Sequence, residues 1–293
     1  MAYAQNSIFA LGNLSHAYLE FDRSGASDAR TLIAAAAHLV EPSTTMGGVN
    51  LVTGIRPELW RDAVGADAPE GIRGFDTAVV GPDGYTMPAT QHDIALWIAG
   101  GSYDVIFDAT TLMVNSLRPA AALATETVGW SYHRDLDLTG FIDGTENPPL
   151  AQAPGYVLIP DGSPGAGGTI WLLQKWAHDA AAWTALQIDE QERVIGRRKS
   201  DSEELDDRPT TSHVARTDQD DFGKIFRRNT AYGSVTDHGT MFVGFARDQR
   251  FLASMLESMA GALGDRDALT RYTRALTGAY YFVPSFDDLA RFA

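Results

Sequence analysis

Apolar and polar residues alternate in several short stretches of the first half of the chain. Residues 16–21, His-Ala-Tyr-Leu-Glu-Phe, have the period-two pattern of a half-buried strand. Elsewhere apolar residues recur at helical spacing, and Ser27 and Asp28 are suited to cap the first such segment. The pattern predicts strands at residues 16–21, 49–53, 92–98 and 127–133 and helices at 28–40 and 103–117. Their order, β-α-β-β-α-β, is that of a ferredoxin-like unit.

The second half shows a similar succession of elements without any literal sequence repeat. A Gly- and Pro-rich segment, residues 155–168, has the composition of a linker that leads into it. Strands are predicted at 169–174, 225–226 and 241–245, with His213 on or beside a strand, and helices at 180–186, 189–195, 249–262 and 267–276. We therefore expect an α+β protein with two halves, residues 1–150 and 151–293.

The composition is that of an ordinary globular protein. The chain has 293 residues, enough for one large domain or two of about 150, and 44% of them are hydrophobic while 21% are charged. No apolar run reaches the roughly 18 residues of a membrane-spanning helix. Residues 1–7 lack the basic and then apolar pattern of a secretory signal. The expected location is the cytoplasm, with no membrane partner.

The absence of cysteine and the net charge limit the kinds of metal site and partner that the chain can have. The chain contains no cysteine, which excludes disulfides, iron–sulfur clusters, thiolate-ligated haem and cysteine-built zinc sites, so histidine remains as the soft metal ligand. The net charge of −15 argues against nucleic acid as a partner. The basic run at 197–199 is followed at once by five acidic residues between 201 and 207, and this pattern favours an internally paired loop.

A loop near the middle of the chain, residues 138–150, holds a single aspartate between glycines. Gly140 and Gly144 flank Phe141-Ile142-Asp143, so the backbone can adopt angles closed to other residues or approach a bound group closely. Asn147-Pro148-Pro149 then prevents any regular element from continuing. The residues alone are also compatible with an ordinary glycine turn in which Asp143 bonds nearby amides.

Residues 140–148, Gly-Phe-Ile-Asp-Gly-Thr-Glu-Asn-Pro, resemble the signature of the dye-decolourising peroxidases, and the rest of the chain resembles their B type. Further matching stretches occur in the expected order at 194–197, 203–206, 212–216, 227–229 and 282–285. The resemblance implies a fold of two ferredoxin-like halves with antiparallel sheets, like that of chlorite dismutase, and haem b in the second half. It also implies a peroxidase that uses hydrogen peroxide, through a ferryl intermediate, to oxidise phenolic compounds and dyes in one-electron steps. The alternative is a haem-handling protein that binds or delivers haem, or removes its iron, with incidental peroxidase activity.

His213, in Ser212-His213-Val214-Ala215-Arg216, matches the family's stretch for the proximal iron ligand, whereas the other six histidines are interpreted as structural. A carboxylate on its second ring nitrogen would strengthen it as a ligand. Asp287 is the candidate for that carboxylate, and a helix cap is the alternative for it.

On the distal face the resemblance places Asp143, Arg227 and Asn229. Cleavage of bound peroxide needs a proton carrier and a positive donor where negative charge develops, and a carboxylate and an arginine supply these. The alternative is a buried ion pair that orders the loop. Arg227 is chosen over Arg228 because the family spacing is Arg-x-Asn, and Arg228 is interpreted as a surface or propionate contact.

Further candidates surround these residues. Arg197 and Arg216 are expected to bind the haem propionates, and Phe242 either lines the distal pocket or is a plain core residue. Five aromatic residues could carry an oxidising equivalent to the surface, although such residues are usually core: Trp171, Trp176, Trp183, Tyr280 and Tyr281. The expected partners are hydrogen peroxide, small aromatic reductants and further copies of the chain. Encapsulin cargo is not predicted, because the sequence shows no tail after Ala293.

Overall fold

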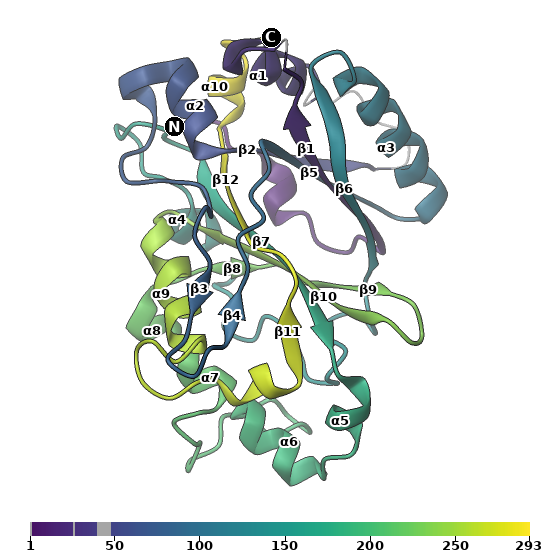
Figure 1. Cartoon of the computed structure of the whole chain (residues 1–293), viewed down its shortest axis with the longest axis vertical. Helices are drawn as coiled ribbons and strands as arrows, with labels where there is room; N and C mark the ends of the chain where they lie inside the picture. The colour runs from purple at the N-terminus through teal and green to yellow at the C-terminus, as the bar shows by residue number, and fades with distance from the viewer. Residues whose placement is uncertain (1, 26, 40–47) are drawn as a thin grey trace.

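The N-terminal half of the computed structural model has the predicted ferredoxin-like topology (Figure 1). The model describes residues 2–25, 27–39 and 48–293; the predicted end of the first helix at Val40 lies outside them. The sheet order is β2-β5-β1-β6, with all neighbours antiparallel. Its elements are β1 (Ser15–Arg23), α1 (Ala29–Ala37), β2 (Asn50–Ile55), β5 (Ile94–Gly100), α3 (Tyr103–Leu117) and β6 (Ala121–Trp130).

Smaller elements lie between β2 and β5, where no helix or strand was predicted. The helix α2 (Pro57–Val64) begins at a proline, because the first helical position needs no N–H and suits the fixed φ of proline. A short hairpin of β3 (Val79–Val80) and β4 (Thr86–Met87) follows.

The C-terminal half repeats the topology with sheet order β12-β7-β10-β9. Its strands are β7 (Thr169–His178), β8 (Phe226–Arg227), β9 (Thr230–Gly233), β10 (His238–Ala246), β11 (Thr273–Ala275) and β12 (Ala279–Val283). Its helices are α4 (Ala153–Val157), α5 (Ala180–Thr184), α6 (Ile188–Ile195), α7 (His213–Arg216), α8 (Gln219–Phe222), α9 (Gln249–Met259) and α10 (Phe286–Leu289). The boundary expected at residue 150 falls in the connection between β6 and β7 and remains a prediction.

Two predictions for this half are wrong. The segment 267–276 is not a helix: it forms a single 3-10 turn (Ala268–Arg271) and then β11, because Thr273, Arg274 and Ala275 pair with β7. His213 does not lie on a strand. It is the first residue of α7, where the Ser212 side chain caps the helix by accepting a hydrogen bond from the Ala215 N–H.

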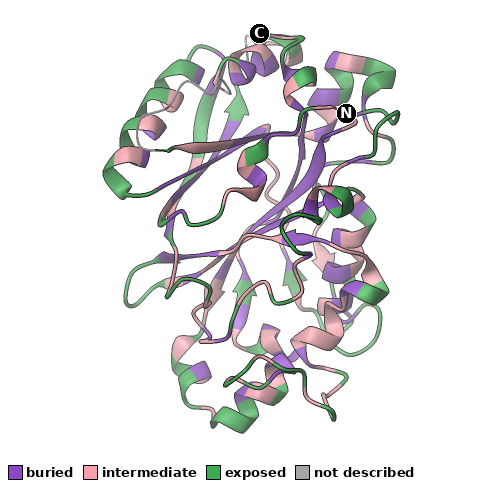
Figure 2. Cartoon of the chain, turned by 180° about the vertical axis from the view of Figure 1, so that it is seen from behind, coloured by how far each residue is buried: buried purple, intermediate pink, exposed green. Residues whose placement is uncertain are grey.

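The two sheets join at both edges and enclose a common core. Phe282 of β12 pairs with Ile55 of β2, and Gly129 and Trp130 of β6 pair with β9, so eight strands form a closed ring. Ring contacts connect the two halves inside it, for example Trp97 with Phe245 at 6.2 Å between centroids. Figure 2 shows these central strands largely buried. Helices α1, α3 and α9 pack against the outer faces.

Alternation along β7 separates the two faces of the C-terminal sheet. Trp171 and Leu173 belong to the core inside the ring, whereas Ile170 and Leu172 pack on the outer face. None of the helices in the described residues has the length and apolar character needed to cross a membrane.

Candidate active site

A cavity of roughly 1310 Å³, counted with its open mouth, lies on the outer face of the C-terminal sheet. The sheet contributes Leu172, Gln174, Trp176, His178, Thr240 and Phe242, and α9 contributes Leu252, Met255, Leu256 and Met259. The central loop covers it with side chains between residues 137 and 146. The cavity therefore belongs to the second half and is capped by the loop, as the sequence predicted for the haem site.

His213 lines this cavity and is oriented by a buried carboxylate. Its Nδ1 lies 2.7 Å from Oδ2 of Asp267, whose side chain is 0% exposed. A carboxylate accepts hydrogen bonds, so Nδ1 is the donor in this pair, and in the neutral ring Nε2 then has the lone pair. No hydrogen bond from a described residue engages Nε2. This is the arrangement of a histidine that ligates a metal through Nε2.

The interpretation of Asp287 as the partner of His213 is wrong. Asp287 lies in the first turn of α10, and its Oδ2 accepts a hydrogen bond from the backbone N–H of Tyr3 at 2.9 Å. Asp267 instead sits before the 3-10 turn that replaced the predicted helix, and its Oδ1 accepts from the Leu269 N–H. Because this segment was predicted as a helix, the carboxylate that bonds His213 was not identified from the sequence.

Asp143, Arg227 and Asn229 line the same cavity. Arg227 Nη2 lies 3.9 Å from Asp143 Oδ1, and Arg227 Nε is buried without a hydrogen-bond partner among the described residues. Asn229 Oδ1 accepts from the Val243 N–H at 3.1 Å, which leaves its NH₂ group to act as a donor. The Asn147 side chain forms two hydrogen bonds with the backbone of Arg227, at 2.8 and 2.9 Å. This asparagine fixes the central loop to β8.

Arg228 is neither a surface residue nor a contact of the main cavity. Its guanidinium donates to the carbonyl oxygens of Ile8 and Ala10 and lies 5.2 Å from the ring centroid of Trp97. Burial lowers the pKa of Arg228 to about 10. The choice of Arg227 as the residue that faces the cavity therefore agrees with the geometry.

The two arginines predicted for propionates are placed differently. Arg197 lines the cavity, where it donates to Glu146 and to Glu204 and, at 2.8 Å, to the carbonyl of Ser202. Arg216 is not among the lining residues, because it turns toward the loop after α9 and donates to the carbonyl of Asp265. Only Arg197 is brought to the site.

Phe242 lines the cavity, and two polar neighbours on the sheet were missed by the sequence reasoning. Gln174 Nε2 is buried without a hydrogen-bond partner among the described residues. His178, interpreted as structural, shares a hydrogen bond with Thr240 at 3.1 Å, and burial lowers its pKa to about 4. Both follow Leu172 in the alternation of β7 toward the outer face, which is the signal that could have identified them.

The aromatic residues proposed as a relay lie in three environments. Trp171, Tyr280 and Tyr281 are buried core residues, and Trp176 lines the cavity. Trp183 donates its Nε1–H to the carbonyl of Thr139 in the central loop.

A family model described as "Dyp-type peroxidase, C-terminal" matches residues 134–288. The chain belongs to the dye-decolorizing peroxidase family. The Dye-decolorizing peroxidase of Mycolicibacterium paratuberculosis (strain ATCC BAA-968 / K-10) is 35% identical over 252 residues, which cover 82% of this chain and 71% of that protein. The Brevibacterium linens protein of the same name is 36% identical, over 82% of this chain and 68% of its own length.

Solved structures agree with this assignment. DyPB from Rhodococcus jostii RHA1 is 32% identical with a TM-score of 0.86 over 96% of each chain, and a variant of it in complex with heme superimposes with a TM-score of 0.87, at 31% identity over 96% of each chain. The dye-decolorizing protein from V. cholerae is 30% identical with a TM-score of 0.87 over 98% of each chain. These comparisons confirm the predicted family, its B type, the ferredoxin-like α+β fold and a peroxidase activity.

Proposed function

We propose that the cavity binds haem b through His213 and that this peroxidase uses hydrogen peroxide to oxidise phenolic compounds and dyes in one-electron steps. The observation that carries the proposal is the presence, in one cavity, of a histidine with a free Nε2 and of an aspartate–arginine pair. The haem-handling alternative needs only the histidine, so the pair favours the peroxidase.

The residues of the cavity suit haem. Its lining by β7, β10 and α9 is largely apolar, as a porphyrin requires. Buried donors without partners, Arg227 Nε and Gln174 Nε2, point to a polar or charged group that belongs there. When bound, haem would supply the iron at which peroxide is reduced and which then takes electrons from the substrate.

Asp143 and Arg227 then have different roles in the cleavage of peroxide. Asp143 takes the proton of the incoming peroxide and returns it to the oxygen that leaves as water. Arg227 donates hydrogen bonds to that oxygen while it gains negative charge, and its position is fixed by Asn147. The free NH₂ group of Asn229 can hold peroxide or water between them.

We assign a propionate to Arg197 rather than to Arg216. Arg197 is held in place by Glu146 and Glu204 on the cavity wall. A guanidinium fixed in this way can still offer an N–H to a carboxylate of the cofactor.

Small aromatic reductants, a cytoplasmic location and a homo-oligomer complete the proposal. The surface between α3 and β6 supports self-association, because large apolar side chains are exposed together there: Tyr103, Phe107 and Leu123. Sedimentation of the purified protein and fractionation of cells test the last two points.

Absorbance spectra of the haem-loaded protein, before and after one equivalent of peroxide, test the function. Stopped-flow mixing should show that Arg227→Leu slows the reaction by about 10²- to 10³-fold. Asp143→Asn should be slowed no more severely and should chiefly change the pH dependence between about pH 4 and 8, because water can replace a proton carrier but not a fixed charge. Parent rates in both variants across that range would favour haem handling instead.

A further inference from the structure

A second cavity, of roughly 670 Å³ with its open mouth, lies beside the first behind the central loop. Five residues line both cavities and so form the wall between them: Asp137, Asp143, Arg227, Asn229 and Thr240. Three of them are the distal residues named above. Asp137 is a second carboxyl group in this wall, and the proposed mechanism does not use it.

The backbone holds Asp137 close to Asp143. The Asp143 N–H donates to the carbonyl of Asp135 at 2.7 Å, and the Asp137 N–H donates to the carbonyl of Phe141 at 3.0 Å. Together with the pairing of Leu136 and Ile142, these bonds form a small antiparallel hairpin that carries Asp135 and Asp137 on one strand and Asp143 on the other. Side chains at such diagonal positions of a ladder are neighbours.

The hydrogen bonds of Asp137 fix one of its oxygens. Thr139 donates both its backbone N–H, at 2.8 Å, and its hydroxyl to Oδ1. Oδ2 is therefore the oxygen suited to carry a proton. The side chain lies within the protein and keeps only part of its surface exposed, in the wall that faces the cavities.

The electrostatic surroundings of the Asp143 and Asp137 carboxyl groups differ. Asp143 is 3.9 Å from Arg227, whereas Asp137 makes no ion pair with any described residue. Burial raises the pKa of Asp137, and the charge of Asp143 raises it further, against hydrogen bonds from Thr139 and Phe141 that lower it. The other charged groups nearby are Lys199, bonded to the Thr139 carbonyl, and the side chains that line the second cavity: Arg134, Asp135 and Arg228.

The proposed function needs protons at this place. Reduction of peroxide to water follows H₂O₂ + 2H⁺ + 2e⁻ → 2H₂O, and an aromatic reductant too large to enter releases its protons where it is oxidised. We propose that Asp137 is a second proton-carrying carboxyl of the active site, which takes a proton from water in the second cavity and passes it through Oδ2 to Asp143. This role rests on the proposed peroxidase function.

Asp137→Asn tests the role, because an asparagine still accepts both Thr139 hydrogen bonds through Oδ1 but cannot carry a proton. In the haem-loaded protein the steady-state rate with peroxide and an aromatic reductant should fall roughly 10-fold or more, below the effect of a direct general acid, and its pH profile should change. Asp62→Asn, an exposed aspartate of α2 that lines neither cavity, should keep the parent rate and profile. A parent rate and profile in Asp137→Asn would overturn the proposal.

Infrared spectra of haem-loaded protein with ¹³C-labelled aspartate provide a readout independent of activity. The parent should show the C=O band of a protonated aspartic acid, which Asp137→Asn removes. In Asp143→Asn the band should titrate at lower pH because the neighbouring charge is gone. An unchanged titration in that variant overturns the proposal even if Asp137→Asn does not fold. If the parent itself does not react with peroxide, the proposed function fails and the role of Asp137 with it.

Discussion

Replacing Asp267 by asparagine tests the hydrogen bond that orients His213. The wild-type carboxylate accepts from His213 Nδ1 through Oδ2 and from the Leu269 N–H through Oδ1. Asparagine has the same shape, but one of its two ends is a donor. If the NH₂ group faces His213, Nδ1 must become an acceptor and the ring proton moves to Nε2, the nitrogen that iron needs. If the amide is turned over, the NH₂ group meets the Leu269 N–H instead.

The structure sets the size of the effect. The Asp267 side chain is 0% exposed, so water cannot take over the lost bond. A hydrogen bond to a charged group contributes about 1.5–3 kcal/mol. When a histidine binds a metal through one ring nitrogen, removal of the hydrogen-bond acceptor on its other ring nitrogen typically costs about 10- to 100-fold in affinity or activity. This factor is about 1.4–2.7 kcal/mol of binding free energy. The two ranges agree, so Asp267→Asn should weaken haem binding by about 10- to 100-fold.

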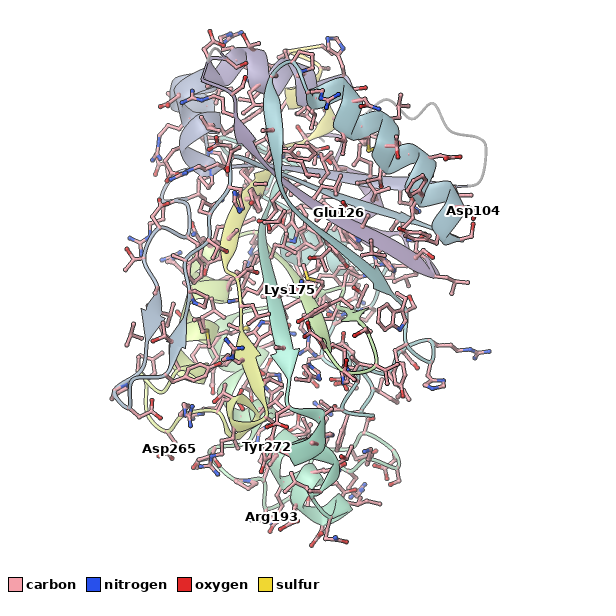
Figure 3. The ribbon with its side chains drawn as sticks, turned by 45° about the vertical axis from the view of Figure 1, so that its right-hand side comes forward. Asp104, Glu126, Lys175, Arg193, Asp265 and Tyr272 are labelled. Carbon is pink, nitrogen blue, oxygen red and sulfur yellow. The ribbon has the colours of Figure 1, made fainter. Side chains whose placement is uncertain are left out.

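Titration of the apoprotein with haem, followed at the Soret band, measures this loss. Asp265→Asn is the matched control, because Asp265 lies at the edge of the molecule in Figure 3 and its carboxylate accepts, among the described residues, only from the hydroxyl of Thr210. That variant should bind haem like the parent. If Asp267→Asn also binds haem with the parent affinity and spectrum, then Asp267 does not set the state of His213.

Three further predictions concern the ligand, the packing and the pH dependence of stability. His213→Ala should abolish stoichiometric haem binding in a Soret titration, whereas His133→Ala, in an exposed loop, should keep it. Gly54→Ala should lower the free energy of unfolding in urea by about 1–3 kcal/mol, since its Cβ would come within 2.7 Å of a buried tyrosine, while Gly101→Ala, with open space, should be nearly neutral. Burial raises the pKa of Glu20, so its contribution to stability is present below pH 4.5 and is lost as pH rises through the raised value. Glu20→Gln should remove that loss when the free energy of unfolding is measured against pH. If the curves of the parent and of Glu20→Gln run parallel from about pH 4 to 8, the prediction is contradicted.

Local patterns predicted most of the strands but not how far they are buried. Residues 16–21 were predicted as a half-buried strand, but both faces of β1 are buried, one inside the ring and one on its outer side. The helix at 103–117 has the predicted bounds. Local spacing gave a wrong prediction where pairing with a distant strand determines the secondary structure. Residues 267–276 have an apolar spacing compatible with a helix, but three of them complete a ladder with β7, and this partner is nearly 100 residues away.

The same distinction between local and distant sequence applies to the residues of the site. Asp143, His213 and Arg227 could be named because they stand in contiguous motifs. The roles of their supports could not be predicted, since Asp267 is 54 residues from His213, and Asn147, although it stands in the 140–148 motif, is 80 from its partner Arg227. Nothing local distinguishes Asp267 among the 38 acidic residues, because folding alone selects its partner.

The two faces of the C-terminal sheet separate stability from chemistry. Side chains on the inner face, such as Trp171 and Phe245, pack inside the closed ring against the N-terminal half. Those on the outer face, such as Gln174 and Phe242, line the cavity and leave it room for a ligand. Successive residues of one strand therefore have different roles, because their side chains point to opposite faces of the sheet. A change inside the ring should lower stability while the apoprotein keeps its haem affinity, and a change on the outer face should do the reverse.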